Sequence, residues 1–223
     1  MPERSCTAVL LDIDGTLVDT NYLHVDAWTR AAAEVGRPVD AWRVHRVIGM
    51  DSSRLLAELL GDDAGRLGDD VKERHRVHYA AQEPRMRAFD RARDLLQELQ
   101  RRGFQVVLAT SSPPEEFAMT TAVLDAGDAV SASTTSEDVE TAKPAPDVVG
   151  VALQKAGVRP EDAVMIGDAV WDAQSCVEAG VRCIGVLSGG VAAEHLREAG
   201  AVAVYDDAAA LLAGLDDSPL YRR

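Results

Sequence analysis

In Thr7-Ala-Val-Leu-Leu-Asp-Ile-Asp-Gly-Thr-Leu-Val-Asp19, a short apolar run passes directly into two acids and a glycine, and this pattern is the strongest indication of the fold. The run is continuously apolar rather than alternating, which is typical of a strand buried on both faces of a parallel sheet. Asp12 and Asp14 follow at positions i and i+2, so both carboxylates are expected on one side at the strand's carboxyl end. Gly15 then permits a sharp backbone turn.

Four further apolar runs of the same kind lie downstream, separated by helical patterns. Several of these patterns are followed within a few residues by glycine, as helix C-termini prefer. This alternation predicts an α/β domain with a doubly wound parallel sheet, whose ligands bind at the carboxyl ends of the strands. The predicted strands are 7–11, 105–109, 163–166, 183–186 and 201–204, and the predicted helices are 91–101, 115–124, 146–156, 172–179 and 192–199.

One segment interrupts the alternation. Residues 21–87 contain helical patterns at 24–35, 52–60 and 70–82 and no convincing strand. We therefore expect an all-helical cap domain, 21–87, inserted into a core domain made of 1–20 and 88–223.

The composition excludes several classes of protein. The 223 residues include 23 Lys and Arg against 37 Asp and Glu, a net charge of −14, which argues against binding to nucleic acid or to anionic membranes. No apolar run approaches 18 residues and none precedes the first strand, so we expect a soluble cytoplasmic protein. The three cysteines lack metal-site spacing and are expected as free thiols. The oligomeric state is not predicted.

Hydroxyls and a lysine follow in the next part of the chain. Thr110, Ser111 and Ser112 come after the predicted strand 105–109 and before a predicted helix, where hydroxyl and N–H groups form an anion site. An ordinary helix N-cap is the competing interpretation. Lys143 precedes a proline and could serve as a point charge for phosphate, with a surface lysine as the alternative.

Two more acids follow the strand 163–166. Asp168 and Asp172 are one helical turn apart, and helix capping by Asp168 is the alternative interpretation. Because parallel strands end at one edge, we expect the acids, hydroxyls and lysine around one pocket. Crowded carboxylates need a cation or a shared proton, and a set of hard oxygen ligands favours Mg²⁺ over zinc.

Four motifs, taken in order, resemble those of the haloacid dehalogenase superfamily of phosphotransferases. They are DIDGTLVD (12–19), LATSS (108–112), KPAPD (143–147) and GDAVWD (167–172). The similarity covers nearly the whole chain and favours the branch with a helical cap after the first strand, which includes phosphoglycolate phosphatases and β-phosphoglucomutases. It implies a Rossmann-like core and a Mg²⁺-dependent phosphatase that hydrolyses a small phosphorylated metabolite through an aspartyl-phosphate.

The resemblance also implies roles for individual residues. Asp12 would be the nucleophile, and Asp14 the acid and base that serves the leaving group and then the attacking water. Thr110, Ser111 and Lys143 would hold the phosphoryl oxygens.

The implied metal site draws on the same region. Mg²⁺ would be bound by the Asp12 carboxylate, the Asp14 main-chain carbonyl and Asp168, with Asp172 supporting its water shell. Asp14 also favours phosphate esters over haloacids, because a departing halide needs no proton.

Competing functions are weighed on sequence features. A phosphosugar mutase is the nearest alternative, but the Gly-x-Ser-Arg turn typical of β-phosphoglucomutases is altered here, with Arg54 two residues late after Gly49. A non-enzymatic phospho-acceptor module would be about half as long, with adjacent acids and no cap. A degenerate binding scaffold would not retain every predicted catalytic group.

Within the cap, His24 and Arg46 are candidate substrate contacts, and a surface helix charge is an equal alternative for Arg46. His75 and His78 are spaced for a metal pair, although a solvated surface is the preferred interpretation.

Overall fold

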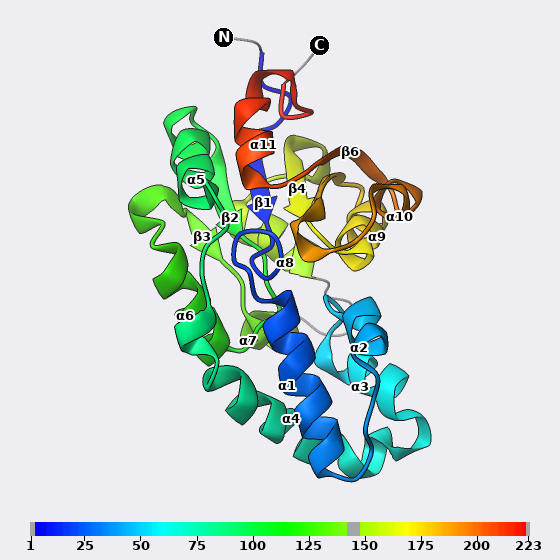
Figure 1. Cartoon of the computed structure of the whole chain (residues 1–223). Coiled ribbons are helices and arrows are strands. Elements are labelled where there is room, and N and C mark those ends of the chain that lie inside the picture. The colour runs from blue at the N-terminus through cyan, green and yellow to red at the C-terminus, as the bar shows by residue number, and fades with distance from the viewer. Residues whose placement is uncertain (1–2, 142–147, 222–223) are drawn as a thin grey trace. The chain divides into compact units, whose positions relative to one another are not determined.

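The computed structural model describes residues 3–141 and 148–221, and the chain divides into two compact units (Figure 1). One unit comprises 1–18 and 87–223, and the other comprises 19–86. The first unit is built on a six-stranded sheet in the order β3-β2-β1-β4-β5-β6, with every pair parallel. The predicted doubly wound α/β fold is confirmed. The strands are β1 (Ala8–Leu11), β2 (Gln105–Leu108), β3 (Ala132–Ser133), β4 (Ala163–Gly167), β5 (Arg182–Val186) and β6 (Ala201–Tyr205).

The strand order creates one switch point, between β1 and β4. The chain proceeds from β1 outward to β2 and β3, then returns to the other side of β1 and continues through β4, β5 and β6. The Asp12 amide donates to the Ile166 carbonyl at 3.0 Å, which keeps the ends of β1 and β4 level. Ligands of doubly wound sheets bind in the crevice outside the strand ends at such a point.

Side chains of β1 alternate between two hydrophobic clusters, one on each face of the sheet. Val9 and Leu11 belong to a cluster with Leu96 of α5, whereas Leu10 belongs to a second cluster with Ala152 of α8. All these side chains are buried, which explains why the strand lacks a polar face. The helices of this unit are α5 (Ala92–Arg101), α6 (Pro114–Leu124), α7 (Ser136–Thr141), α8 (Val148–Ala156), α9 (Val170–Ala179), α10 (Ala193–Glu198) and α11 (Ala208–Ala213).

The second unit is helical throughout. Its hydrophobic cluster includes Trp28, Leu56 and Val71, and α3 begins at an N-cap where the Asp51 carboxylate accepts from two main-chain amides. A seven-residue helix, α2, was not predicted, because only Val44 of its side chains is buried and so it carries no apolar periodicity. The helices are α1 (Asn21–Glu34), α2 (Ala41–Val47), α3 (Ser52–Leu60) and α4 (Ala64–Ala80).

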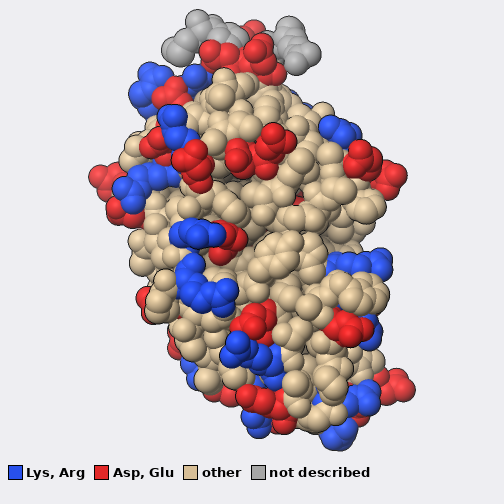
Figure 2. Space-filling model, viewed as in Figure 1, with Lys and Arg blue, Asp and Glu red and all other residues tan. Residues whose placement is uncertain are grey.

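Acidic and basic side chains are interspersed on the face shown in Figure 2. Many form exposed ion pairs, such as Arg76 with Glu73 and Arg91 with Asp94, each at 2.6 Å. Such exposed pairs contribute little stability individually. Within the described ranges, none of the helices combines the length and the apolar character needed to cross a membrane.

Candidate active site

The main chain after β1 forms a tight turn that presents Asp12 and Asp14. The amides of Leu17 and Val18 both donate to the Ile13 carbonyl, at 2.8 and 2.9 Å. Gly15 has a φ of +77°, in the left-handed region that glycine adopts without strain. The turn that follows Asp12 and Asp14 therefore depends on Gly15.

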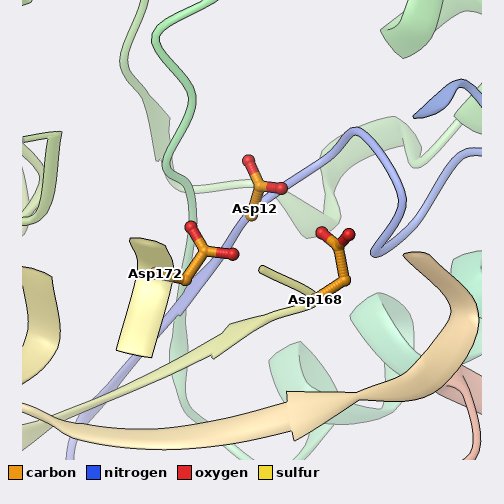
Figure 3. Close-up of side chains that lie close together, drawn as sticks. All are labelled: Asp12, Asp168 and Asp172. Carbon is orange, nitrogen blue, oxygen red and sulfur yellow. The ribbon is translucent and has the colours of Figure 1, made fainter. Parts of the chain in front are cut away.

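Three of the acids selected from the sequence meet in this unit. Ligand atoms of Asp12, Asp168 and Asp172 all lie within 4.8 Å of one another. Figure 3 shows their carboxylates on the same side, reached from the end of β1, the end of β4 and the start of α9. This convergence follows from β1 and β4 being neighbours in the sheet.

The electrostatics of the cluster favour a cation. Burial, followed by the charges of Asp172, Asp168 and Asp14, raises the pKa of Asp12 well above its usual value. Burial also raises the pKa of Asp172 to about 6, against the opposing effect of the main-chain N–H groups of Ala169 and Asp168. A divalent cation would offset this repulsion, and a set of carboxylate oxygens fits a hard ion such as Mg²⁺.

Two hydrogen bonds orient the acids beyond β4. Thr16 Oγ1 donates to Asp168 Oδ1 at 3.0 Å, and both side chains are buried. The Ala169 amide donates to Asp172 Oδ2 at 3.0 Å. Ala169 is the N-cap of α9, so the alternative in which Asp168 caps this helix is wrong. The Asp172 carboxylate instead accepts a hydrogen bond from the main-chain amide of the N-cap residue Ala169.

The turn after β5 supports the cluster, although none of its residues is among the site residues predicted from the sequence. Ser188 Oγ donates to the Gly15 carbonyl at 2.7 Å, joining this turn to the one after β1. Gly189 packs so closely on Asp168 that a Cβ there would lie 1.7 Å from Asp168 Oδ2. Neither residue carries charge, and the only sequence signal is a serine followed by paired glycines after an apolar strand.

The hydroxyls after β2 bond to Asp14 and to each other. Ser112 Oγ donates to Asp14 Oδ2, and Thr110 Oγ1 donates to Ser112 Oγ, both at 3.0 Å. The N-cap of α6 is Pro113, so the N-cap interpretation of these hydroxyls is wrong. Ser111 lies exposed between Thr110 and Ser112. Lys143 and its motif, 143–147, lie outside the described residues, so the role of this lysine stays a prediction.

The candidate residues of the cap lie in the second unit. His24 Nδ1 lies 3.0 Å from His75 Nε2, and the His24 ring stacks on Tyr79 with centroids 3.9 Å apart. His75 is only 4% exposed, so the preferred interpretation of a solvated residue is wrong for it, and burial lowers its pKa well below the usual value. His78 Nε2 instead lies 2.8 Å from Glu34 Oε1.

Arg46 is exposed and lies over the Trp42 ring, 5.9 Å from its centroid. A substrate contact by His24 or Arg46 stays a prediction.

Comparison with known proteins identifies the family. Residues 6–180 match the family model of haloacid dehalogenase-like hydrolases, and the chain belongs to this family. The predicted superfamily and the prediction of an enzyme are confirmed.

Individual relatives cover most of the chain. A phosphoglycolate phosphatase of Rhodospirillum rubrum is 30% identical over 215 residues, which cover 92% of this chain and 88% of the relative. Validoxylamine A 7'-phosphate phosphatase of Streptomyces hygroscopicus subsp. limoneus is 29% identical over 182 residues, 80% of this chain and 84% of the relative. The crystal structure of a hydrolase from Pseudomonas syringae matches with a TM-score of 0.87 and 31% identity, over 95% of this chain and 98% of that one.

Proposed function

We propose that this chain is a Mg²⁺-dependent phosphatase that hydrolyses the phosphate monoester of a small metabolite through an aspartyl-phosphate on Asp12. The convergence of Asp12, Asp168 and Asp172 at the switch point of the sheet carries the proposal. The phosphatase activities named for two curated relatives support it. The substrates named for these two relatives differ. The proposal therefore names only a class of substrate, small phosphorylated metabolites.

The reaction needs two displacements at phosphorus. A carboxylate oxygen of Asp12 forms a bond to phosphorus while the bond to the leaving oxygen breaks, and Asp14 gives that oxygen a proton. Water then attacks the aspartyl-phosphate, Asp14 takes up its proton, and inorganic phosphate departs with the Asp12 carboxylate restored. Ser111 and Lys143 hold the phosphoryl oxygens during both displacements, whereas the hydroxyl of Thr110, which was expected to join them, donates to Ser112 Oγ at 3.0 Å.

Charge repulsion opposes the first displacement. A carboxylate and a phosphate dianion about 4 Å apart repel by about 8 kcal/mol at an effective dielectric constant of about 20. Uncompensated, this repulsion would slow the reaction by nearly six orders of magnitude. Asp12, Asp168 and the Asp14 carbonyl would hold Mg²⁺, which would supply compensating positive charge, and Asp172 would support its water shell.

Hydrolysis of p-nitrophenyl phosphate in the presence of Mg²⁺ tests the proposal. We expect turnover by the wild-type protein, inactivation by a chelator, and recovery when Mg²⁺ is restored. Asp12→Asn should abolish turnover, because an amide cannot act as the nucleophile. Asp128→Asn, a matched change at an exposed acid of the same unit, should leave turnover unchanged. Full activity of Asp12→Asn would refute the aspartyl-phosphate.

A second assay addresses the substrate. A panel of phosphorylated metabolites should show phosphate release from a small subset. With β-glucose 1-phosphate, formation of an isomeric sugar phosphate without net phosphate release would instead identify a mutase.

A further inference from the structure

Ser112 lies at the centre of a hydrogen-bonded chain that ends on the proposed acid and base. We propose that Ser112 is a positioning residue that holds the Asp14 carboxyl group where it can serve the leaving oxygen. This inference rests on the phosphatase function proposed above. It assigns Ser112 no contact with the phosphoryl group.

The hydroxyl protons in this row of hydrogen bonds all point toward Asp14. Thr110 Oγ1 accepts from the Ser112 amide and donates to Ser112 Oγ, both at 3.0 Å. Because the Ser112 hydroxyl oxygen accepts the Thr110 proton, its own proton is available for Asp14 Oδ2, also at 3.0 Å. With Asp14 Oδ2 accepting from Ser112, the other carboxyl oxygen, Oδ1, is left to carry the proton that the leaving oxygen needs.

The far end of this row of hydrogen bonds is buried and doubly hydrogen-bonded. The Thr110 amide donates to Thr134 Oγ1 at 2.9 Å, and Thr134 Oγ1 donates back to the Thr110 carbonyl at 2.8 Å. Thr110 is 3% exposed and Thr134 is fully buried. Ser112 is thereby connected to the ends of β2 and β3, whereas Asp14 stands on the turn after β1. The hydrogen bond across 98 residues ties a turn side chain to the sheet framework.

The position of the Asp14 carboxyl group matters because a general acid must lie within hydrogen-bond distance of the leaving oxygen that it protonates. Displacing a reacting group by about 1 Å can cost about 100-fold in rate. A proton donor is needed most when the leaving alkoxide is strongly basic and least when the leaving group is a stable phenolate. A defect in positioning Asp14 should therefore depend on the leaving group, whereas a defect in phosphoryl binding should not.

The test compares p-nitrophenyl phosphate with an alkyl phosphate. For Ser112→Ala we expect kcat on the alkyl phosphate to fall about tenfold to a hundredfold, with KM little changed. Turnover of p-nitrophenyl phosphate should stay within about threefold of wild type. Ser112→Thr, which keeps the hydroxyl, should recover most of the alkyl phosphate activity. Ser131→Ala removes a hydroxyl near the start of β2 and should change neither substrate.

A double-mutant cycle identifies the partner. If Ser112 acts through Asp14, the variant with both Ser112→Ala and Asp14→Asn should be no slower on the alkyl phosphate than Asp14→Asn alone. Equal losses on both substrates, or losses that multiply in the double variant, would overturn the inference.

A structural readout separates this inference from the proposed function. A crystal structure of Ser112→Ala should show the Asp14 carboxyl group in a new orientation, and an unchanged orientation would overturn the positioning role whatever the activity. Wild-type protein without phosphatase activity would overturn the proposed function, while the Asp14 orientation would still decide the inference.

Discussion

The turn after β5 leaves no room for a side chain at Gly189. A Cβ there would lie 1.7 Å from Asp168 Oδ2, 2.5 Å from its Cγ and 2.7 Å from its Cβ. Non-bonded heavy atoms prefer separations of about 3.5 Å or more, so the Asp168 carboxylate would have to retreat by roughly 2 Å. Rotation of the carboxylate alone is insufficient, because the Asp168 Cβ is also too close.

We therefore expect Gly189→Ala to act on both stability and metal binding. Overpacking costs about 1–3 kcal/mol, and about 1 kcal/mol shifts the Tm of a chain of this size by about 2–4 °C, so the Tm should fall by about 2–12 °C. Displacing Asp168 also breaks its hydrogen bond to Thr16. Loss of such supporting contacts weakens metal affinity by about tenfold to a hundredfold.

Calorimetry with and without Mg²⁺ measures both effects independently of turnover. At 100 times its dissociation constant, a ligand specific for the folded state adds about 2.7 kcal/mol of stability, so Mg²⁺ should raise the Tm of the wild type and raise that of Gly189→Ala much less. Gly65→Ala is the matched control, because nothing lies within 4 Å of the added Cβ in α4. That variant should be as stable as the wild type or slightly more stable.

The outcome that would refute this reasoning is a Gly189→Ala protein with the wild-type Tm and the wild-type response to Mg²⁺. Such a result would mean that Asp168 relaxes without cost and that the turn after β5 does not position it.

Two further predictions concern stability. Hydrogen bonds from Arg101 and Arg102 lower the pKa of Glu98 to about 2 from 4.5, so its carboxylate stabilises the fold above pH 4.5 and this contribution is lost as the pH falls toward 2. Glu98→Gln should thus lower the urea midpoint at pH 6 more than at pH 3, and equal effects at both pH values would contradict the assignment. Asp51 Oδ1 accepts from the Ser53 and Arg54 amides at 3.1 Å, so Asp51→Ala should cost about 0.5–2 kcal/mol in urea unfolding, whereas an unchanged midpoint would show that the cap is dispensable.

Local pattern was sufficient to predict most of the sheet. Strands buried on both faces are short apolar runs between helices, and five of the six strands match such runs. The exception is β3, which has only two residues, both partly exposed, and therefore shows no apolar run in the sequence. The helix α2 was missed for a related reason, since it buries only Val44. Elements that bury few side chains leave little pattern in the sequence.

Local sequence patterns were enough to predict which acids and hydroxyls follow the strands of the sheet. Acids at positions i and i+2 after an apolar strand are expected on one side of it, because side-chain alternation is a local rule. Hydroxyls after the next strand are expected at the same edge only if the two strands are parallel neighbours. The contacts between these groups could be seen only in the folded structure. Ser112 meets Asp14, and Gly189 packs on Asp168, across strand neighbours set by the order of the sheet. Such contacts require atoms from separate turns to lie within about 3 Å of each other. The spacing of residues within one segment does not specify the distance between two segments.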